Sequence, residues 1–325
     1  MIKLVTPTKS YVTHYQDAIR FCEQAESIFW TANEINVEKD KQDMLVNMTE
    51  AERHGVITTL KLFTLYELIA GNEYWLGRVK ENFPRPEIQR MCSVFGMFEL
   101  NIHAPFYNKL NQVLGLDNDE FYLGYVNDPV LSGRISFVDG LVSDPDLLVS
   151  LGCFSLVEGA VLYSSFAFLK HFQAKGKNKL LNVVRGINFS LRDENLHATA
   201  GAWLYRSVRD EVLKEGPSYR VHVENAVERI IEASKAIYEH EARIVDMIFE
   251  KGEMEGITAE QMKKFVQSRI NLCLSQLGLP KVFEVMNDTI SDWFYDNINA
   301  LSFNDFFTGV GNNYNRSWDE KGFIW

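Results

Sequence analysis

Apolar and polar residues follow a helical period along most of this chain. Long segments carry apolar side chains three and four positions apart, a spacing that puts them on one face of a helix. These segments cover residues 49–83, 85–115, 144–173, 178–214, 218–251, 258–277 and 283–299. The strict alternation of a half-buried strand is nearly absent. The pattern therefore predicts one all-α domain of long helices, preceded by a looser segment.

Residues that commonly begin or end a helix stand at the borders of these segments. Thr49 is a suitable N-cap for the first segment, which runs to Pro84. The second segment has Pro86 near its first turn and ends at Gly115. These signals favour separate helices over one continuous rod.

The end of the chain has a different composition. Residues 305–325 lack a helical period and contain Gly309 and Gly311, together with aromatic side chains that include Tyr314 and Trp325. We therefore predict a helical domain over residues 1–300 and a flexible tail over 301–325 that docks on a partner. The alternative is a tail that folds back on the core.

Charge and hydropathy exclude several classes of protein. A net charge of −11 without a basic run argues against a nucleic-acid surface. The N-terminus lacks the apolar stretch of a signal peptide. The apolar segment 147–169 is interrupted by Glu158, so we expect a buried helix and no membrane span. The scattered cysteines form no C-x-x-C pair, which argues against zinc knuckles and a disulfide framework and favours the cytoplasm.

Four successive helical segments carry ionisable residues in otherwise apolar surroundings. They are Glu67, Glu99 with His103, Glu158, and Glu194 with His197. Any one of them could be a satisfied core residue or part of a solvated face. Together they form the ligand set of ferritin-like carboxylate bundles, in which four carboxylates and two imidazoles surround two metal ions. Carboxylates suit Fe(II) and Mn(II) and can bridge two ions. We therefore predict a ferritin-like helical bundle with a dinuclear metal–carboxylate site.

The first Glu–His pair has an irregular spacing. Glu99 precedes His103 by four residues, whereas Glu194 precedes His197 by three, and both spacings keep a pair on one helix face. Pro105 cannot donate a backbone hydrogen bond within the helix. The inserted residue and the missing hydrogen bond predict a π-bulge that re-aims Glu99 toward the metal. The alternative is that Glu99 does not bind, which leaves a site poorer in carboxylates.

The motifs around these residues resemble the small, radical-generating subunit of class I ribonucleotide reductase. The resemblance extends from residues 27–40 to the tail and is carried by "LYELIAGNEYW", "HAPFY", "VEGAVLYSSFAF" and "RDENLH". In that family a dimetal site reacts with O₂ to make a stored oxidant, commonly a tyrosyl radical. The oxidant passes to a large subunit that reduces ribonucleotides to deoxyribonucleotides. The family pattern is usually Glu-x-x-His, so Leu100 stands where its glutamate is expected.

The resemblance implies a role for each candidate residue. The six residues above would be metal ligands and Tyr107 the radical tyrosine. Trp30, Asp193 and His103 would form a transfer path, with Tyr314 as its mobile end. The implied cofactors are two transition-metal ions, with Fe/Fe preferred and Mn/Mn or Mn/Fe as alternatives, and O₂ as oxidant. The implied partners are the large subunit, bound through the tail, and a second copy of the chain.

The sequence alone leaves alternative roles open for these residues. Trp30 could be a core aromatic and Asp193 a surface acid. A stand-alone dimetal oxidase or oxygenase would need the ligands, but no Trp30, Asp193 or tail tyrosine. A non-catalytic metal-binding bundle would usually be much shorter and needs no aromatic tail. Phe166 lies two turns beyond Glu158, so we also expect it to wall the pocket of Tyr107.

Overall fold

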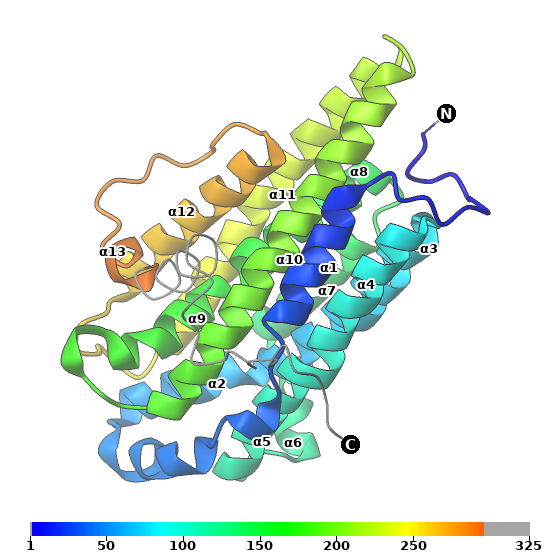
Figure 1. Cartoon of the computed structure of the whole chain (residues 1–325). Helices are drawn as coiled ribbons and strands as arrows, with labels where there is room; N and C mark the ends of the chain where they lie inside the picture. The colour runs from blue at the N-terminus through cyan, green and yellow to red at the C-terminus, as the bar shows by residue number, and fades with distance from the viewer. Residues whose placement is uncertain (1, 296–325) are drawn as a thin grey trace, which may run out of the picture.

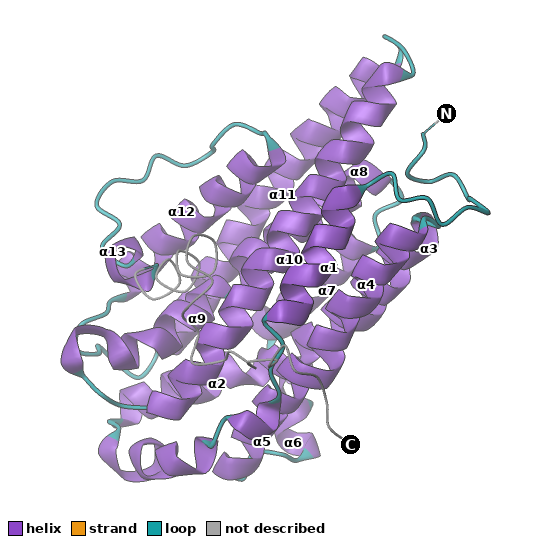
Figure 2. Cartoon of the chain, in the orientation of Figure 1, coloured by secondary structure: helices purple, strands orange, loops and turns teal. Residues whose placement is uncertain are grey.

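The computed structural model describes residues 2–295, and helices form almost all of its regular structure (Figures 1 and 2). The two longest helices are α10 (Leu181–Lys214) and α11 (Tyr219–Ile248), which contact each other along the bundle. Within the described range the β-structure consists of one isolated bridge between Met254 and Ile257. The predicted all-α class is confirmed.

The segment predicted over 49–83 is helical but changes type along its length. It consists of α2 (Glu50–Leu68), the π-helical η4 (Ile69–Val79) and α3 (Lys80–Asn82). Thr49 is its N-cap, as expected. The Thr49 hydroxyl accepts from the backbone N–H of Glu52, and the Glu52 carboxylate accepts from the backbone N–H of Thr49. This capping box satisfies donors that the first turn would otherwise leave free.

The segment predicted over 85–115 is divided into three parts. These are α4 (Pro86–Phe98), the π-helical η5 (Glu99–His103) and α5 (Ala104–Leu114). Gly115 ends the segment with φ 70°, a left-handed conformation that suits glycine. The predicted irregularity between Glu99 and Pro105 is therefore confirmed.

The most apolar segment forms a central element of the bundle. It contains α8 (Leu147–Leu156), the π-helical η7 (Val157–Val161), α9 (Tyr163–Lys170) and the 3₁₀ turn η8 (His171–Gly176). Among the described residues, Leu147–Ala174 is the one stretch long and apolar enough to cross a membrane, but 94% of its most apolar window is buried inside the protein. The expectation of a buried core helix is confirmed.

Helix α12 (Ala259–Leu277) matches its predicted segment, but the helix predicted over 283–299 is wrong in its described part. Only α13 (Ser291–Phe294) is helical there. The side-chain oxygen of Asn271 accepts from the backbone N–H groups of Val282 and Phe283, which satisfies that backbone without a helix. Residues 296–299 lie outside the described part of the chain.

Two well-formed helices were not anticipated. Helix α1 (Gln16–Ser27) lies in the segment expected to be loose and packs against α4. Its buried residues, Ala18, Cys22 and Ala25, are small and give a weak hydrophobic signal. Helix α7 (Pro129–Val142) begins where the Asp128 carboxylate accepts from two backbone N–H groups. The remaining short helical elements are η1 (Ala32–Glu34), η2 (Val37–Asp40), η3 (Asp43–Asn47), α6 (Asp119–Tyr122) and η6 (Gly124–Asn127).

Candidate metal centre

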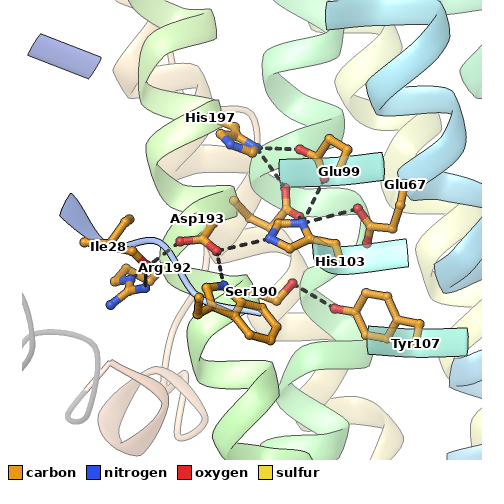
Figure 3. Close-up of polar contacts among 11 residues, drawn as sticks. Ile28, Glu67, Glu99, His103, Tyr107, Ser190, Arg192, Asp193 and His197 are labelled. Carbon is orange, nitrogen blue, oxygen red and sulfur yellow. Dashed lines mark hydrogen bonds and ion pairs between the residues drawn. The ribbon is translucent and has the colours of Figure 1, made fainter. Parts of the chain in front are cut away.

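Four helical segments bring the six candidate ligands together. Figure 3 shows four of them, Glu67, Glu99, His103 and His197, pointing toward one another. Helix α2 provides one glutamate, η5 a Glu–His pair, η7 one glutamate and α10 a second Glu–His pair. All six side chains are buried, and none is more than 4% exposed. The residues are Glu67, Glu99, His103, Glu158, Glu194 and His197. The tertiary structure thus brings together every candidate ligand named from the sequence.

The π-helical segment η5 turns Glu99 inward. The backbone N–H of Ala104 donates to the carbonyl of Glu99, five residues earlier, which is the hydrogen bond of a π-helix. Glu99 is 0% exposed and belongs to the cluster. Leu100 instead packs toward η4, where a Cβ added to Gly71 would lie 2.7 Å from Leu100 Cγ. The extra residue in the Glu99–His103 spacing is therefore absorbed by the bulge.

One group of ligand atoms surrounds Nδ1 of His103. This nitrogen lies 2.8 Å from Glu99 Oε2, 3.1 Å from Glu194 Oε1 and 3.5 Å from Glu67 Oε2. The other ring nitrogen, Nε2, is 3.1 Å from Asp193 Oδ2. Because Asp193 occupies Nε2, the nitrogen that faces the three glutamates is Nδ1.

A second group lies around His197 and shares two carboxylates with the first. It consists of Glu99, Glu158, Glu194 and His197, whose potential ligand atoms all lie within 4.8 Å of one another. His197 Nδ1 lies 2.5 Å from Glu99 Oε1 and 3.9 Å from Glu194 Oε2. Glu99 and Glu194 belong to both groups. Two adjacent groups with two common carboxylates suit a pair of bridged ions.

The polar atoms of the cluster do not satisfy one another. Both ring nitrogens of His197, and Oε1 of Glu67, Glu99 and Glu194, lack a well-formed hydrogen bond among the described residues. The short contact between His197 Nδ1 and Glu99 Oε1 therefore lacks the alignment of a hydrogen bond. Buried polar atoms without partners are costly, and metal ions at these positions would bind them. The residues present fit a dinuclear metal site.

The electrostatics of Glu67, Glu194 and His197 are compatible with a metal site. Burial raises the pKa values of Glu67 and Glu194 to about 8, and neighbouring carboxylates add to the effect. Burial lowers the pKa of His197 to about 4, so its imidazole is neutral and has a lone pair to offer. Metal cations would stabilise the ionised carboxylates that burial disfavours.

The proposed transfer residues form a continuous set of hydrogen bonds. Asp193 Oδ2 accepts from Trp30 Nε1 at 2.7 Å and lies 3.1 Å from His103 Nε2 (Figure 3). Trp30 is fully buried and its ring contacts Phe106 edge to face. The Arg192 guanidinium donates to the backbone carbonyl of Ile28, close to Trp30 in the chain. Tyr314, the expected end of this path, lies outside the described residues.

Tyr107 lies in the apolar pocket expected for it. It is fully buried, and its hydroxyl lies 2.8 Å from Ser190 Oγ. Its ring stacks on Phe63, with ring centroids 4.4 Å apart, and Phe166 stacks on Phe63 in turn at 5.4 Å. Burial raises the pKa of Tyr107 well above its usual value, so the phenol keeps its proton.

The structure adds three residues that sequence reasoning missed. Trp75 Nε1 donates to Glu158 Oε1 at 2.9 Å, and Phe63 and Ser190 contact Tyr107. Ser190 precedes Glu194 by four residues, so helical spacing could have placed it on the same face. Trp75 and Phe63 lack such a signal, because a tryptophan or phenylalanine in a core helix is common. A small cavity of about 10 Å³ beside Glu67, Glu158 and Glu194 leaves room for one water-sized molecule.

Comparison with known proteins identifies the family. The family described as "Ribonucleotide reductase, small chain" matches residues 9–289, which is most of the chain. This chain belongs to the ribonucleotide reductase small chain family. It is therefore the small subunit of ribonucleoside-diphosphate reductase, an oxidoreductase that acts with a large subunit.

Individual relatives of this small subunit are distant but cover most of its length. A probable ribonucleoside-diphosphate reductase small subunit of Invertebrate iridescent virus 3 is 26% identical over 89% of this chain and 79% of its own. Small chain 1 of the Saccharomyces cerevisiae enzyme is 25% identical over 93% of this chain and 72% of its own.

Solved structures show the same fold. The dimanganese(II) NrdF of Streptococcus sanguinis superposes with a TM-score of 0.76 at 18% identity, over 88% of this chain and 96% of its own. A putative class I ribonucleotide reductase from Bacillus halodurans gives a TM-score of 0.72 at 22% identity, over 82% and 94%. The predicted ferritin-like bundle is confirmed.

Proposed function

We propose that the six clustered residues bind two iron ions, and that Tyr107 stores the oxidising equivalent generated with O₂. One observation carries this proposal: two adjacent ligand groups share Glu99 and Glu194, and a buried phenol follows His103 by one helical turn. When bound, the metal pair supplies the redox chemistry with O₂ that oxidises the phenol. Mn/Mn and Mn/Fe pairs use the same oxygen and nitrogen ligands, so these are the alternatives that metal analysis distinguishes.

Each ligand has a place in this proposal. Glu67 and His103 belong to one group only, and Glu158 and His197 to the other. Glu99 and Glu194, which belong to both, would help to hold both ions. The four carboxylates would offset the charge of two dications in a buried site.

The surroundings of Tyr107 support storage of an oxidant. Loss of one electron and the phenolic proton would leave a neutral radical, and burial keeps water and reductants away from it. The rings that contact Tyr107 are Phe63 and Phe106, and phenylalanine is harder to oxidise than tyrosine. The oxidised state is therefore not lost to the rings in direct contact with Tyr107.

We propose that the oxidant leaves along His103, Asp193 and Trp30 toward the large subunit. These three side chains are joined by contacts of 3.1 and 2.7 Å, and tryptophan can be oxidised transiently. Tyr314, in the tail over residues 301–325, would be the next carrier once the tail docks on the large subunit.

The assembly we propose contains a homodimer of this chain. The cysteines of the described chain are all buried and unpaired, which fits a reducing cytoplasm.

Metal analysis combined with electron paramagnetic resonance tests this function. The metal-free protein is loaded with Fe(II) and exposed to O₂, and we expect two iron ions per chain and a tyrosyl signal. Tyr107→Phe should bind the same iron but give no tyrosyl signal. Tyr205→Phe is a matched control, because Tyr205 is also fully buried but lies outside the cluster. A tyrosyl signal that persists unchanged in Tyr107→Phe would remove Tyr107 from this role.

A further inference from the structure

A buried arginine on α12 holds the π-helical segment that carries Glu158. Arg269 is 1% exposed, and its Nε and Nη2 both donate to the backbone carbonyl of Gly159, at 3.0 and 2.8 Å. Gly159 directly follows Glu158 in η7. The two-pronged contact therefore acts on the backbone one residue away from the candidate ligand.

The helix needs such support at this point. The regular helical pattern is interrupted between η7 and α9, and carbonyls at an interruption require donors from elsewhere. Two arginines provide them. Arg134 on α7 donates to the carbonyl of Val161 at 2.7 Å, and Arg269 donates to that of Gly159.

The two arginines differ in how their charge is balanced. Arg134 pairs with Glu241 at 2.8 Å. Among the described residues no carboxylate pairs with Arg269, whose guanidinium lies 3.7 Å from the centre of the Tyr163 ring and donates to Tyr295 Oη at 2.9 Å. Burying a cation without a carboxylate partner costs folding free energy. The contacts that Arg269 makes must offset this cost.

Close packing leaves η7 little freedom against α12. A Cβ added to Gly159 would lie 2.3 Å from the sulfur of Cys273, which is four residues after Arg269 on α12. The backbone of η7 therefore lies directly on α12. On the side chain of Glu158, the indole of Trp75 holds Oε1 at 2.9 Å.

We propose that Arg269 is a positioning residue for Glu158. By holding the Gly159 carbonyl, it fixes η7 in the conformation that directs the Glu158 carboxylate to the second ligand group. Arg269 fixes the backbone, and Trp75 orients the carboxylate. This inference rests on the proposed function, because it requires Glu158 to be a metal ligand.

Titration of the metal-free full-length protein with Mn(II), followed by electron paramagnetic resonance, tests the proposal. Wild type should bind two ions and give the spectrum of a coupled pair. In Arg269→Gln and Arg269→Lys we expect the second ion to bind about 10-fold more weakly or worse, with loss of the coupled spectrum, while the first binds nearly as in wild type. Arg269→Lys keeps the buried charge but has one ammonium in place of the two-pronged contact, so it tests the same point if Arg269→Gln fails to fold.

Two further variants separate positioning from general stability. Lys170→Met removes another buried cation, which donates to the Phe294 carbonyl next to Tyr295, and it should keep both ions. Glu158→Gln should itself lose the second ion. If Arg269 acts through Glu158, then adding Arg269→Lys to Glu158→Gln should cause no further loss of metal binding.

The outcomes are distinct. A folded Arg269 variant that binds two Mn(II) ions with wild-type affinity and an unchanged coupled spectrum overturns the positioning role and leaves the proposed function intact. An additional loss in the double variant also overturns it. Binding of fewer than two ions by wild type overturns both the proposed function and this inference.

Discussion

A single oxygen atom, Oδ2 of Asp193, joins the candidate metal centre to Trp30. It accepts from the Trp30 indole and contacts Nε2 of His103, so one carboxylate orients both rings. A carboxylate at this position fixes the tautomer of the imidazole, so that Nδ1 would face a metal ion. It also makes Nδ1 a stronger electron-pair donor to that ion. Asp193 would therefore act on the proposed metal site through His103.

The effect of the Asp193 charge on metal binding can be tested with a substitution that keeps the shape of the side chain. We expect Asp193→Asn to weaken metal binding by roughly 10- to 100-fold, because an amide polarises the His103 ring less than a carboxylate does. Titration with Mn(II) measures the effect. Asp210→Asn, an exposed acid on the same helix, is the control and should bind metal as wild type does. Equal affinities for all three proteins would contradict the role given to Asp193.

At the scale of elements, the helices around the site differ in regularity. The segments that carry Glu99, His103 and Glu158 are π-helical, and Glu67 lies just before the π-helical η4. Segments of this kind are rare and occur often at functional sites, because they change the direction of a side chain within a helix. Helix α10 is α-helical throughout and packs against α8, α9, α11 and α12.

Close packing of the Phe106 side chain of α5 on α10 can be tested at Gly186. A Cβ added there would lie 2.2 Å from the Phe106 ring, so Gly186→Ala should lower the free energy of unfolding by about 1–3 kcal/mol. The matched control is Gly133→Ala in α7, where a Cβ would meet nothing within 4 Å. That variant should be stabilised by about 0.5–1 kcal/mol, because alanine is the better helix former. Urea unfolding measures both, and a neutral Gly186→Ala would show that the Phe106 ring can move aside.

At the scale of the whole molecule, the pH dependence of stability should include a contribution from Glu241. Burial raises the pKa of Glu241 to about 7 although Arg134 lies 2.8 Å away, whereas its ordinary value is 4.5. The folded protein thus holds this proton more tightly than the unfolded chain. The stabilising contribution is complete below pH 4.5 and is lost as the pH rises through about 7.

The comparison of wild type with Glu241→Gln isolates this effect. Between about pH 4.5 and about pH 8, wild type should lose about 2–3 kcal/mol of unfolding free energy that the variant does not lose. Urea unfolding of the metal-free proteins at several pH values gives both curves. Parallel curves would mean that Glu241 titrates alike in the folded and unfolded states.

Mutations in the tail should distinguish two roles, docking on the large subunit and electron transfer to it. Deletion of residues 318–325 should weaken association and nucleotide reduction together, because it removes aromatic anchors of the proposed tail. Tyr314→Phe should associate normally but lose nucleotide reduction at a saturating concentration of the large subunit, because phenylalanine is far harder to oxidise. Binding and turnover are measured with the cognate large subunit, and near-normal turnover by Tyr314→Phe would exclude Tyr314 from the path.

The sequence by itself determined the helical class, the cap at Thr49 and the identity of the six clustered residues. These follow from local rules: helical period, capping chemistry, and acids and imidazoles within apolar helices. It also determined the irregularity at Glu99, because an inserted residue and Pro105 act on the backbone near them. The sequence did not predict α1, because its buried residues are small and give a weak signal. Nor did it predict the irregular segment bound by Asn271, because that segment depends on a distant side chain.

Only the tertiary structure decided how the site is supported. Trp75 meets Glu158 across 83 positions of sequence, and Arg269 meets Gly159 across 110. Neither contact leaves a local pattern, because any buried tryptophan or arginine would look the same in its own helix. The same holds for Phe63 on Tyr107. The local sequence specifies which groups a helix presents, whereas the packing of distant helices specifies which of them meet.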